Sequence, residues 1–235
     1  LLRRLLQNFH TGIHINRTQL LEARLDLQDE INVAYEKFFS HPEVKPHVTE
    51  YNSKKLDELA AKEPNQRTKK GDISKNWLSW KEKWKKAVNT NHFNLNSGPQ
   101  KEWLFYEKLG YPEIVFNDKG KRQVDKKALK GFGESGRLLR EYNDLWKVDS
   151  YIETCLEKLG RDNILHPLFR APGTLSGRLG GSGGFNVQQQ PKHRGYLEAW
   201  RPPEGYAWVD VDFTSLEQIV LAELSKDPTL WTLYG

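Results

Sequence analysis

Three carboxylates stand close together in the stretch WVDVDFTSLEQIVLAELSKD: Asp210, Asp212 and Glu217. A carboxylate at the end of a rigid strand is a natural ligand for a divalent cation, although hydration or pairing with a lysine is the commoner fate of such a group. Glu217 also follows Thr214 by three residues, the spacing of a capping box, in which it would only satisfy a backbone donor. These residues alone leave a metal site and an ordinary strand-to-helix turn both open.

A strand followed by a helix is expected to position these carboxylates. In YAWVDVDF, polar and apolar residues alternate, so Asp210 and Asp212 share one face of the predicted strand because strand side chains alternate in direction. The opposite, apolar face consists of Ala207, Val209, Val211 and Phe213. From Thr214 onward the spacing becomes helical. The expected buried stripe of that helix is Leu216, Ile219, Val220, Ala222 and Leu224.

A glycine-rich stretch, TLSGRLGGSGGFNVQQQP, lies about forty residues upstream and carries Arg178 and four amides. The amides are Asn186, Gln188, Gln189 and Gln190. An amide can donate and accept together, which suits the edges of nucleic-acid bases, while glycine lets a backbone approach a phosphate chain closely. Each feature could also belong to an ordinary loop.

The remaining elements predict an α+β protein, with a helical part followed by the start of an antiparallel sheet and its packed helices. Periodicity indicates two helices between Leu1 and Phe39, one over Lys101–Leu109 and a long one from Glu134 to Leu159. Residues 40–73 carry prolines and charge runs typical of a loop or mobile insertion. A sheet is expected from Arg161 onward, so we predict divisions at 1–39, 40–90, 91–160 and 161–235.

Positive charge is concentrated in one part of the chain. The net charge is +5, but residues 51–90 hold ten Lys and one Arg against five acids, which is +6 and leaves −1 elsewhere. Within this segment Trp77, Trp80, Trp84 and Val88 share one helical face. The charge is compatible with phosphate binding or with a solvated lysine-rich surface, and the tryptophans with core packing or with a ligand platform.

Cysteine and methionine usage bears on the context of the chain. The single cysteine, Cys155, lies in a helical pattern and is predicted to be a buried structural thiol in a reducing compartment. No stretch of about 20 apolar residues and no secretory leader is recognisable, so a soluble, intracellular protein without a membrane partner is expected. The start LLRR and the absence of methionine suggest a fragment.

Four stretches in order resemble the family A DNA polymerases, the class of bacterial repair, phage and organellar replicases. They are FNLNSGPQKEWLFYEKLG, NDKGKRQVDKKAL, LSGRLGGSGGFNVQQQP and PPEGYAWVDVDFTSLEQIVLAELSKD. LLQNFHTGIHIN also resembles the helix and turn before the family's thumb. The resemblance covers most of the chain except about residues 40–90, and it implies that residues 1–39 lead into the thumb, that 91–160 are thumb helices and that 161–235 are the first part of the palm.

The resemblance assigns roles to the carboxylates. It implies that Asp212, rather than Asp210, binds both catalytic Mg²⁺ ions, with the carbonyl of Phe213 as a further ligand. Two such ions clamp the attacking 3′-oxygen and the leaving phosphate, and a carboxylate at a strand end can bridge them. Glu217 matches the family's sugar-discriminating glutamate, which crowds the 2′ position of an incoming deoxynucleoside triphosphate, and Ser215 and Leu216 stand beside it as nucleotide-binding residues.

The resemblance also assigns contacts with primer-template DNA. Arg178 matches the arginine at the primer end, and Asn186 and Gln189 match amides near the minor groove, where base pairs of either order offer acceptors in similar places. The other residues expected to bind DNA are Ser182, Gln188, Asn96 and Ser97. Two departures weaken the match: the loop between Arg178 and Asn186 is one residue longer than in the common bacterial form, and Leu197 and Glu198 stand where the family usually carries arginine.

The function implied is template-directed DNA synthesis, with this chain supplying the thumb, the primer grip and one catalytic aspartate. The fingers lysine and the second catalytic carboxylate do not occur, so we expect no polymerisation by this chain alone. The chain would then be either a truncated polymerase or one half of a polymerase completed by a complementary chain.

Residues 40–90 are expected to bind DNA or a processivity protein. Location in a bacterial or phage-infected cytoplasm, or in an organelle, would follow. The alternative is a non-catalytic DNA-binding or partner-binding module of polymerase shape; a related RNA polymerase is disfavoured by Glu217.

Overall fold

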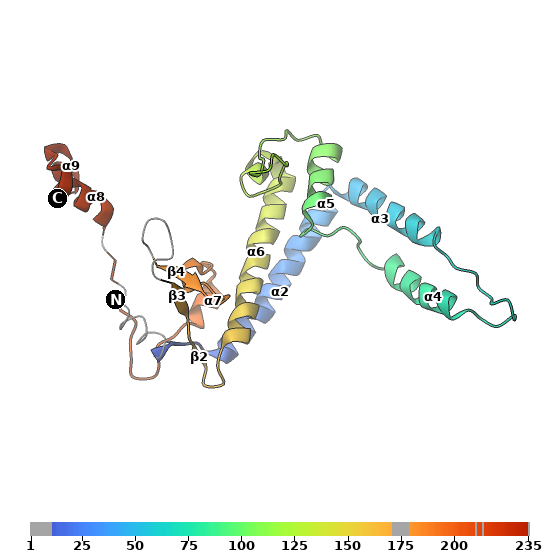
Figure 1. The fold of residues 1–235 in the computed structure, drawn as a ribbon, viewed down its shortest axis with the longest axis horizontal. Coiled ribbons are helices and arrows are strands. Elements are labelled where there is room, and N and C mark those ends of the chain that lie inside the picture. Colours follow the sequence, from blue (N-terminus) through green and yellow to red (C-terminus); the bar gives the residue numbers. More distant parts are fainter. Residues whose placement is uncertain (1–10, 171–178, 210, 213, 235) are drawn as a thin grey trace.

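The computed structural model describes residues 11–170, 179–209, 211–212 and 214–234. As predicted, it is an α+β structure in which helices dominate (Figure 1). The helices are α2 (Arg17–Ser40), α3 (Lys45–Ala60), α4 (Lys75–Val88), α5 (Gly98–Glu102), η1 (Trp103–Lys108, a π-helix), η2 (Ala128–Gly131, 3₁₀), α6 (Gly133–Lys158), η3 (Val187–Gln189, 3₁₀), α7 (Arg194–Glu198), α8 (Leu216–Ser225) and α9 (Pro228–Tyr234). The strands are β1 (Ile13–His14), β2 (Ile164–Leu165), β3 (Leu168–Arg170) and β4 (Gly180–Ser182).

Helices α2 and α6 lie antiparallel and form the spine of the molecule (Figure 1). Asn16 caps α2 by accepting a hydrogen bond from the backbone N–H of Gln19 at 3.1 Å, and Arg17 at its start donates to the carbonyls of Leu159 and Gly160 just past the end of α6. The apolar residues at three- and four-residue spacing pack between the two helices. They are Leu20, Leu27, Ile31 and Phe38 from α2, and Leu138, Leu139, Ile152 and Cys155 from α6. The predicted long helix is therefore confirmed, and Cys155 is buried as expected.

A partly buried ion pair crosses this spine. Asp149 on α6 is only 5% exposed, and its carboxylate accepts hydrogen bonds from Arg24 Nε and Gln28 Nε2, each at 2.9 Å. Arg24 also approaches the exposed carboxylate of Glu153 at 3.4 Å. Because Asp149 is removed from water, its charge depends on these α2 donors for compensation.

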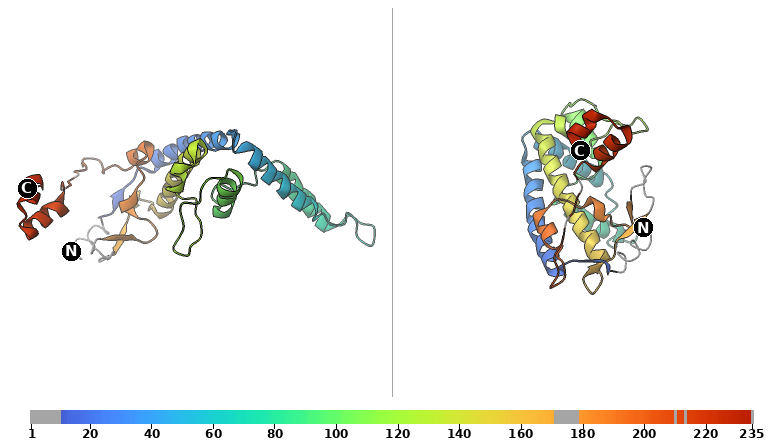
Figure 2. Two further views of the ribbon diagram at one scale, coloured as in Figure 1. Left: turned by 90° about the horizontal axis from the view of Figure 1, so that it is seen from above. Right: turned by 90° about the vertical axis from the view of Figure 1, so that its left-hand side faces the viewer.

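Helices α3 and α4 form a hairpin that projects from the end of the spine, and we call residues 45–90 the arm (Figures 1 and 2). The prediction of a loop over residues 40–73 is wrong for Lys45–Ala60, which is a helix. Pro46 lies in its first turn, where the missing N–H breaks no helical hydrogen bond, so the proline starts the helix instead of ending it. Val44 and Val48 anchor this end of the arm in the core.

The tryptophan face of α4 packs on α3. Trp77, Trp80 and Trp84 are half-buried, the rings of Trp80 and Trp84 stack at 5.6 Å, and Trp80 Nε1 donates to the carbonyl of Leu59 at 3.0 Å. The amphipathic helix is thus confirmed for the three tryptophans, whereas Val88, predicted on the same face, is exposed; of the two interpretations of the tryptophans the structure supports packing.

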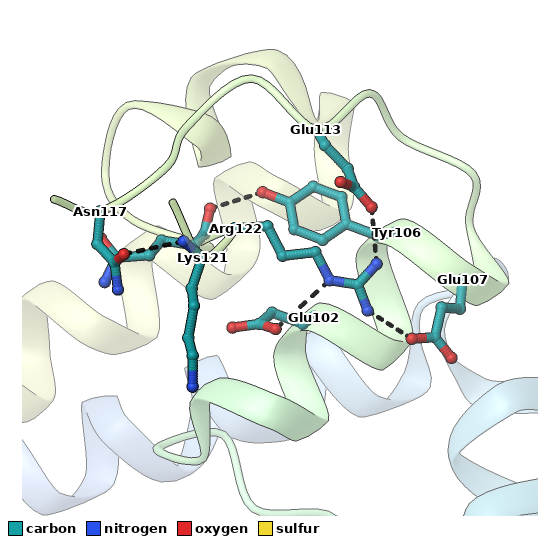
Figure 3. Close-up of polar contacts among 8 residues, drawn as sticks. Glu102, Tyr106, Glu107, Glu113, Asn117, Lys121 and Arg122 are labelled. Atoms are coloured by element: carbon teal, nitrogen blue, oxygen red, sulfur yellow. Dashed lines mark hydrogen bonds and ion pairs between the residues drawn. The ribbon is translucent and has the colours of Figure 1, made fainter. Parts of the chain in front are cut away.

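The loop between η1 and η2 is fixed by one arginine (Figure 3). Arg122 contacts the carboxylates of Glu113 at 2.7 Å and Glu107 at 2.6 Å, and approaches Glu102 at 3.5 Å. These carboxylates raise the pKa of Arg122. The turn itself is closed by Asn117, whose backbone N–H donates to the carbonyl of Lys121 at 2.8 Å.

We predict that Arg122→Gln loosens this loop, because a neutral amide cannot hold carboxylates from two elements together. Amide hydrogen exchange at residues 115–123 should accelerate by about tenfold, the modest effect expected of surface ion pairs. Arg137→Gln is the matched control, since Arg137 is an exposed arginine on α6 that pairs with Glu134 and Glu141. Equal exchange in both variants would show that Arg122 does not hold the loop.

Two small antiparallel sheets lie at the other end of the spine. Strand β1 pairs with β2 through Ile13 and Leu165, and β3 pairs with β4 through Leu168 and Ser182. An isolated bridge joins Ile15 to Trp200. The predicted change from helix to sheet after Arg161 is therefore confirmed.

The predicted strand over YAWVDVDF is not formed by its described residues, 206–209 and 211–212. Val209 and Val211, expected in the core, are 82% and 76% exposed. A strand needs a neighbour for its backbone hydrogen bonds, and no described segment pairs with this one.

The expected apolar stripe of α8 is also largely wrong. Ala222 is buried and Ile219 half-buried, whereas Leu216, Val220 and Leu224 are exposed. The helix packs on α9, which is too short to cover the whole face. None of the helices in the described part of the chain combines the length and apolar composition that a membrane crossing requires.

Candidate catalytic residue and nucleic-acid interface

Asp212 lies in an extended connection that leads from α7 to α8. Its side chain is exposed. Ser215 then adopts a left-handed conformation, with φ of 55°, and α8 begins at Leu216. Asp210 and Phe213, and with Phe213 the predicted carbonyl ligand, lie outside the described residues.

The capping box predicted for Thr214 and Glu217 is not formed. Ser215 occupies the N-cap position, no side chain accepts a capping hydrogen bond there, and Glu217 falls one position too early in the helix. The left-handed residue at Ser215 shifts the helix start by one residue. Glu217 is exposed in the first turn of α8, where the helix dipole favours a negative charge.

The donors around Asp212 fit a metal site that is shared with a substrate. Among the described residues no group of three or more His, Cys, Asp or Glu side chains is placed to hold an ion. Mg²⁺ characteristically keeps several waters and takes one or two protein carboxylates together with substrate phosphates. One exposed carboxylate such as Asp212 fits that role as part of a shared site, and does not make a closed protein cage.

The amide loop is built on the β3–β4 hairpin. Asn186 caps η3 by accepting a hydrogen bond from the backbone N–H of Gln188 at 3.0 Å. Its side chain also explains a glycine: a Cβ added at Gly181 would lie 2.3 Å from Asn186 Oδ1, so only glycine permits this approach. The side chains of Gln188 and Gln189 are exposed.

A buried tyrosine anchors this loop to the core. Tyr196 on α7 is fully buried, and its hydroxyl is hydrogen-bonded to Gln190 Oε1. Gln190 Nε2 in turn donates to the carbonyl of Asn186 at 2.6 Å. Burial raises the pKa of Tyr196, so the phenol remains protonated and able to donate. The amides therefore rest on a fixed support.

A pocket of about 320 Å³ separates the hairpin from α6. Ser182 and Asn186 line it from the hairpin side, and Ser150, Tyr151 and Thr154 from α6. Sequence reasoning missed these three α6 residues. Thr154 follows Ser150 by four residues and Tyr151 by three, so hydroxyl groups gather on neighbouring positions of one helical face, and this is the signal that could have found them.

The remaining predicted DNA contacts lie in different places. Asn96 is exposed and Ser97 precedes α5, at the end of the spine opposite the β3–β4 hairpin (Figure 1). The structure therefore does not bring these two residues together with Ser182 and Asn186. Arg178 lies outside the described residues. On α7 the carboxylate of Glu198 is paired with Arg194 at 2.8 Å, which lowers the pKa of Glu198.

The described elements form a curved molecule (Figure 2). Figure 2 (left) shows an arc with α2 along its outer side, the arm at one end and α8 and α9 at the other. The β3–β4 hairpin, α5 and the loop of Arg122 lie toward the inner side. The β3–β4 hairpin and α5 therefore lie on the same side of the arc.

Comparisons with known proteins give a consistent result. The sequence profile of DNA polymerase family A matches residues 64–235. The chain is 26% identical over 188 residues to the DNA polymerase of Bacillus phage SP01, covering 77% of this chain and 20% of the relative. It is 25% identical over 229 residues to the DNA polymerase of Escherichia phage T5, covering 95% of this chain and 22% of the relative.

A bacterial enzyme and a solved structure extend this result. The thermostable DNA polymerase I of Thermus aquaticus is 32% identical over 148 residues, or 59% of this chain and 18% of that enzyme. The POL domain of Pol1 from M. smegmatis, solved in complex with DNA primer-template and dNTP, superposes with a TM-score of 0.65 at 19% identity, over 96% of this chain and 33% of that one. At that identity the likeness shows the fold. The chain spans about a fifth of the length of the curated relatives it matches.

Proposed function

Because the chain belongs to DNA polymerase family A, we propose that it contributes to template-directed DNA synthesis, in which a deoxynucleotide is joined to the 3′ end of a primer. The observation that carries the proposal is the profile match over residues 64–235, which includes both the exposed Asp212 and the amide loop. The chain spans a fifth of its relatives, so the activity is proposed for the complete polymerase to which this chain contributes.

We assign Asp212 to the metal ions and to the reacting atoms. Its carboxylate, with the carbonyl of Phe213, would hold two Mg²⁺ ions against the primer 3′-oxygen and the nucleotide phosphates. When bound, the ions would lower the pKa of the 3′-hydroxyl and neutralise charge on the leaving phosphate. Asp212 is exposed, and is therefore open to ligands arriving from solution.

We assign the incoming nucleotide to the start of α8. Glu217 would stand beside the sugar, and Ser215 and Leu216 would line the same position. The left-handed Ser215 and the first turn of α8 support this, because they turn the chain sharply between Asp212 and Glu217.

We assign the primer-template duplex to the amide loop and the adjoining face of α6. The exposed Gln188 and Gln189, with Ser182, Asn186 and Arg178, would meet the duplex near the primer end. Amides there can accept base pairs of any sequence through minor-groove acceptors, as a copying enzyme requires. Asn96 and Ser97, at the far end of the spine, would meet backbone phosphates instead.

A further polymerase segment is proposed as the partner of α8 and α9. Leu216, Val220, Leu224 and Leu233 are exposed on these helices, and Val209 and Val211 precede them. A contiguous apolar surface of this kind usually packs against another surface. We therefore propose that fingers and further palm strands cover it, supplied in the same polypeptide or by a complementary chain.

Primer extension by the complete polymerase tests the function. A labelled primer on a template, with the four deoxynucleoside triphosphates and Mg²⁺, should be extended in a template-dependent way. Duplex binding without any extension would favour the alternative, a non-catalytic DNA-binding module that keeps the polymerase shape.

Glu217→Ala is expected to weaken discrimination against ribonucleotides. Without the carboxylate beside the 2′ position, the added hydroxyl no longer meets a steric and electrostatic barrier. The ratio of kcat/KM for a ribonucleotide to that for the matching deoxynucleotide should rise about a hundredfold or more. Gln218→Ala, at the exposed next position of α8, is the control and should leave the ratio unchanged. An unchanged ratio in Glu217→Ala would remove Glu217 from this role.

A further inference from the structure

The excess positive charge of the chain belongs to one half of the arm. Helix α3, Lys45–Ala60, contains three lysines and three acids and is neutral. Residues 61–90 contain eight lysines and one arginine against three acids, which gives +6. The whole charge that the sequence places in residues 51–90 therefore lies on the tip loop and α4, which we call the basic edge.

The two halves of the arm differ in how many of their cations form ion pairs. On α3, Lys54 pairs with Glu50 at 2.7 Å and Lys55 pairs with Glu58 at 2.8 Å. Of the nine cations on the basic edge, Lys85 alone has an ion pair within the described part of the chain, with Glu82 at 3.3 Å. Most of the positive potential of the basic edge is thus available to an external anion.

The packing of α4 turns this charge outward. Trp77, Trp80 and Trp84 face α3, so Lys75, Lys83 and Lys86 point to other faces and are exposed. The large apolar side chains exposed on the basic edge are Ile73, Leu78 and Val88, whereas all nine of its cations are exposed. The surface is therefore complementary to an extended anion.

The base of the arm is fixed to the rest of the molecule. Lys108 on η1 contacts Glu50 at 2.8 Å, and Lys108 together with Lys54 lowers the pKa of that carboxyl to about 2. Asn91 donates to the hydroxyl of Tyr35 on α2 at 2.9 Å and accepts from Asn52 on α3 at 3.1 Å. A fixed base holds the basic edge at a defined distance from the amide loop.

We propose that the basic edge binds the phosphates of duplex DNA about one helical turn behind the primer end. The proposal rests on the proposed function, which places the primer end near the amide loop. Helix α6 has 26 residues, about 39 Å at 1.5 Å per residue, and leads from the amide loop to the base of the arm, from which α4 and the tip loop extend outward (Figure 1). At 3.4 Å per base pair this corresponds to about 11 base pairs of duplex. Binding at the basic edge would slow release of the duplex between additions.

Salt dependence of binding tests the proposal. The test variant, in the complete polymerase, combines Lys69→Gln, Lys70→Gln, Lys83→Gln and Lys86→Gln on the basic edge. The control, Lys54→Gln with Lys55→Gln, removes two paired lysines from the neutral α3. Binding is measured on duplexes of about 8 and about 24 base pairs, below and above the expected 11. Tryptophan fluorescence checks that the α3–α4 packing is retained.

The expected result depends on duplex length. On the long duplex the test variant should reduce the slope of log affinity against log salt by about 2 to 4, near 0.9 for each phosphate that a lysine no longer neutralises. On the short duplex the slope should not change, and the control should change neither. An unchanged slope on the long duplex would overturn the proposal and leave a processivity protein as the ligand of the arm. A slope that changes in a polymerase that binds the duplex but does not extend primers would overturn the proposed function and leave the basic edge standing.

Discussion

Replacing Asp212 with alanine is expected to reduce nucleotide incorporation by the complete polymerase about a thousandfold to ten-thousandfold. The carboxylate would no longer hold the metal ions that stabilise the transferred phosphoryl group, an effect of several kcal/mol, and each 1.4 kcal/mol is a factor of ten in rate. Binding of the primer-template should change little, because the phosphates are held by other residues. Single-turnover incorporation and duplex titration measure the two quantities separately.

Alanine variants of two other carboxylates serve as comparisons for Asp212→Ala. Glu223 is exposed on α8 and forms an ion pair with Lys226, so Glu223→Ala removes a nearby negative charge that has no assigned role. Its incorporation rate should equal that of the unmodified enzyme. Asp210→Ala should cause a smaller loss than Asp212→Ala, since only Asp212 matches the metal-binding position. Equal losses at Asp212 and Glu223 would contradict the assignment.

Asp149→Ala is expected to destabilise the α2–α6 spine by about 2 to 4 kcal/mol. The substitution leaves the donors of Arg24 and Gln28 without the carboxylate that they share in a nearly dry position. For a chain of this length the thermal midpoint should fall by about 5 to 15 °C. Differential scanning calorimetry measures the change.

Glu153→Ala is the matched control for the spine. Glu153 approaches the same Arg24 at 3.4 Å, but its side chain is 57% exposed. A solvated pair of this kind is worth at most about 1 kcal/mol, so the midpoint should move by only a few degrees. If the two variants unfolded at the same temperature, burial of Asp149 would not be what makes the pair important.

The helices that could be predicted from sequence are those whose partners lie within the chain. The periodicity of α6 predicted its buried face correctly, and the tryptophans of α4 predicted its packing face, because α2 and α3 supply the opposite surfaces. Helix α3 was missed because Pro46 and the surrounding charges are typical of loops, although a proline in the first turn is favourable.

The segment of Asp212 shows the opposite case. Alternation in YAWVDVDF predicts one buried and one polar face, yet Val209 and Val211 are exposed. Alternation indicates which side chains would be buried in a sheet. It does not provide the neighbouring strand that the sheet needs. The next helix begins at Leu216, one residue later than predicted, because Ser215 takes a left-handed conformation that the residue pattern did not predict.

The amide loop was only partly predictable. Its residue types suggested contacts with bases. The hydrogen bonds that link Tyr196 through Gln190 to Asn186 could not be predicted, because these residues meet only in the folded chain. The separation of Asn96 and Ser97 from Ser182 likewise depends on the length and direction of α6. Sequence reasoning named the candidate residues, and the fold determined which of them can meet one ligand.

The most direct test is a structure of the complete polymerase with primer-template, a non-hydrolysable deoxynucleoside triphosphate and Mg²⁺. The expected result is a carboxylate oxygen of Asp212 about 2.0 to 2.1 Å from each ion, with the primer 3′ end and the nucleotide phosphates on the same ions. An Asp212 side chain that faces the apolar interior, or that is held by a lysine or arginine away from the duplex, would contradict the central assignment.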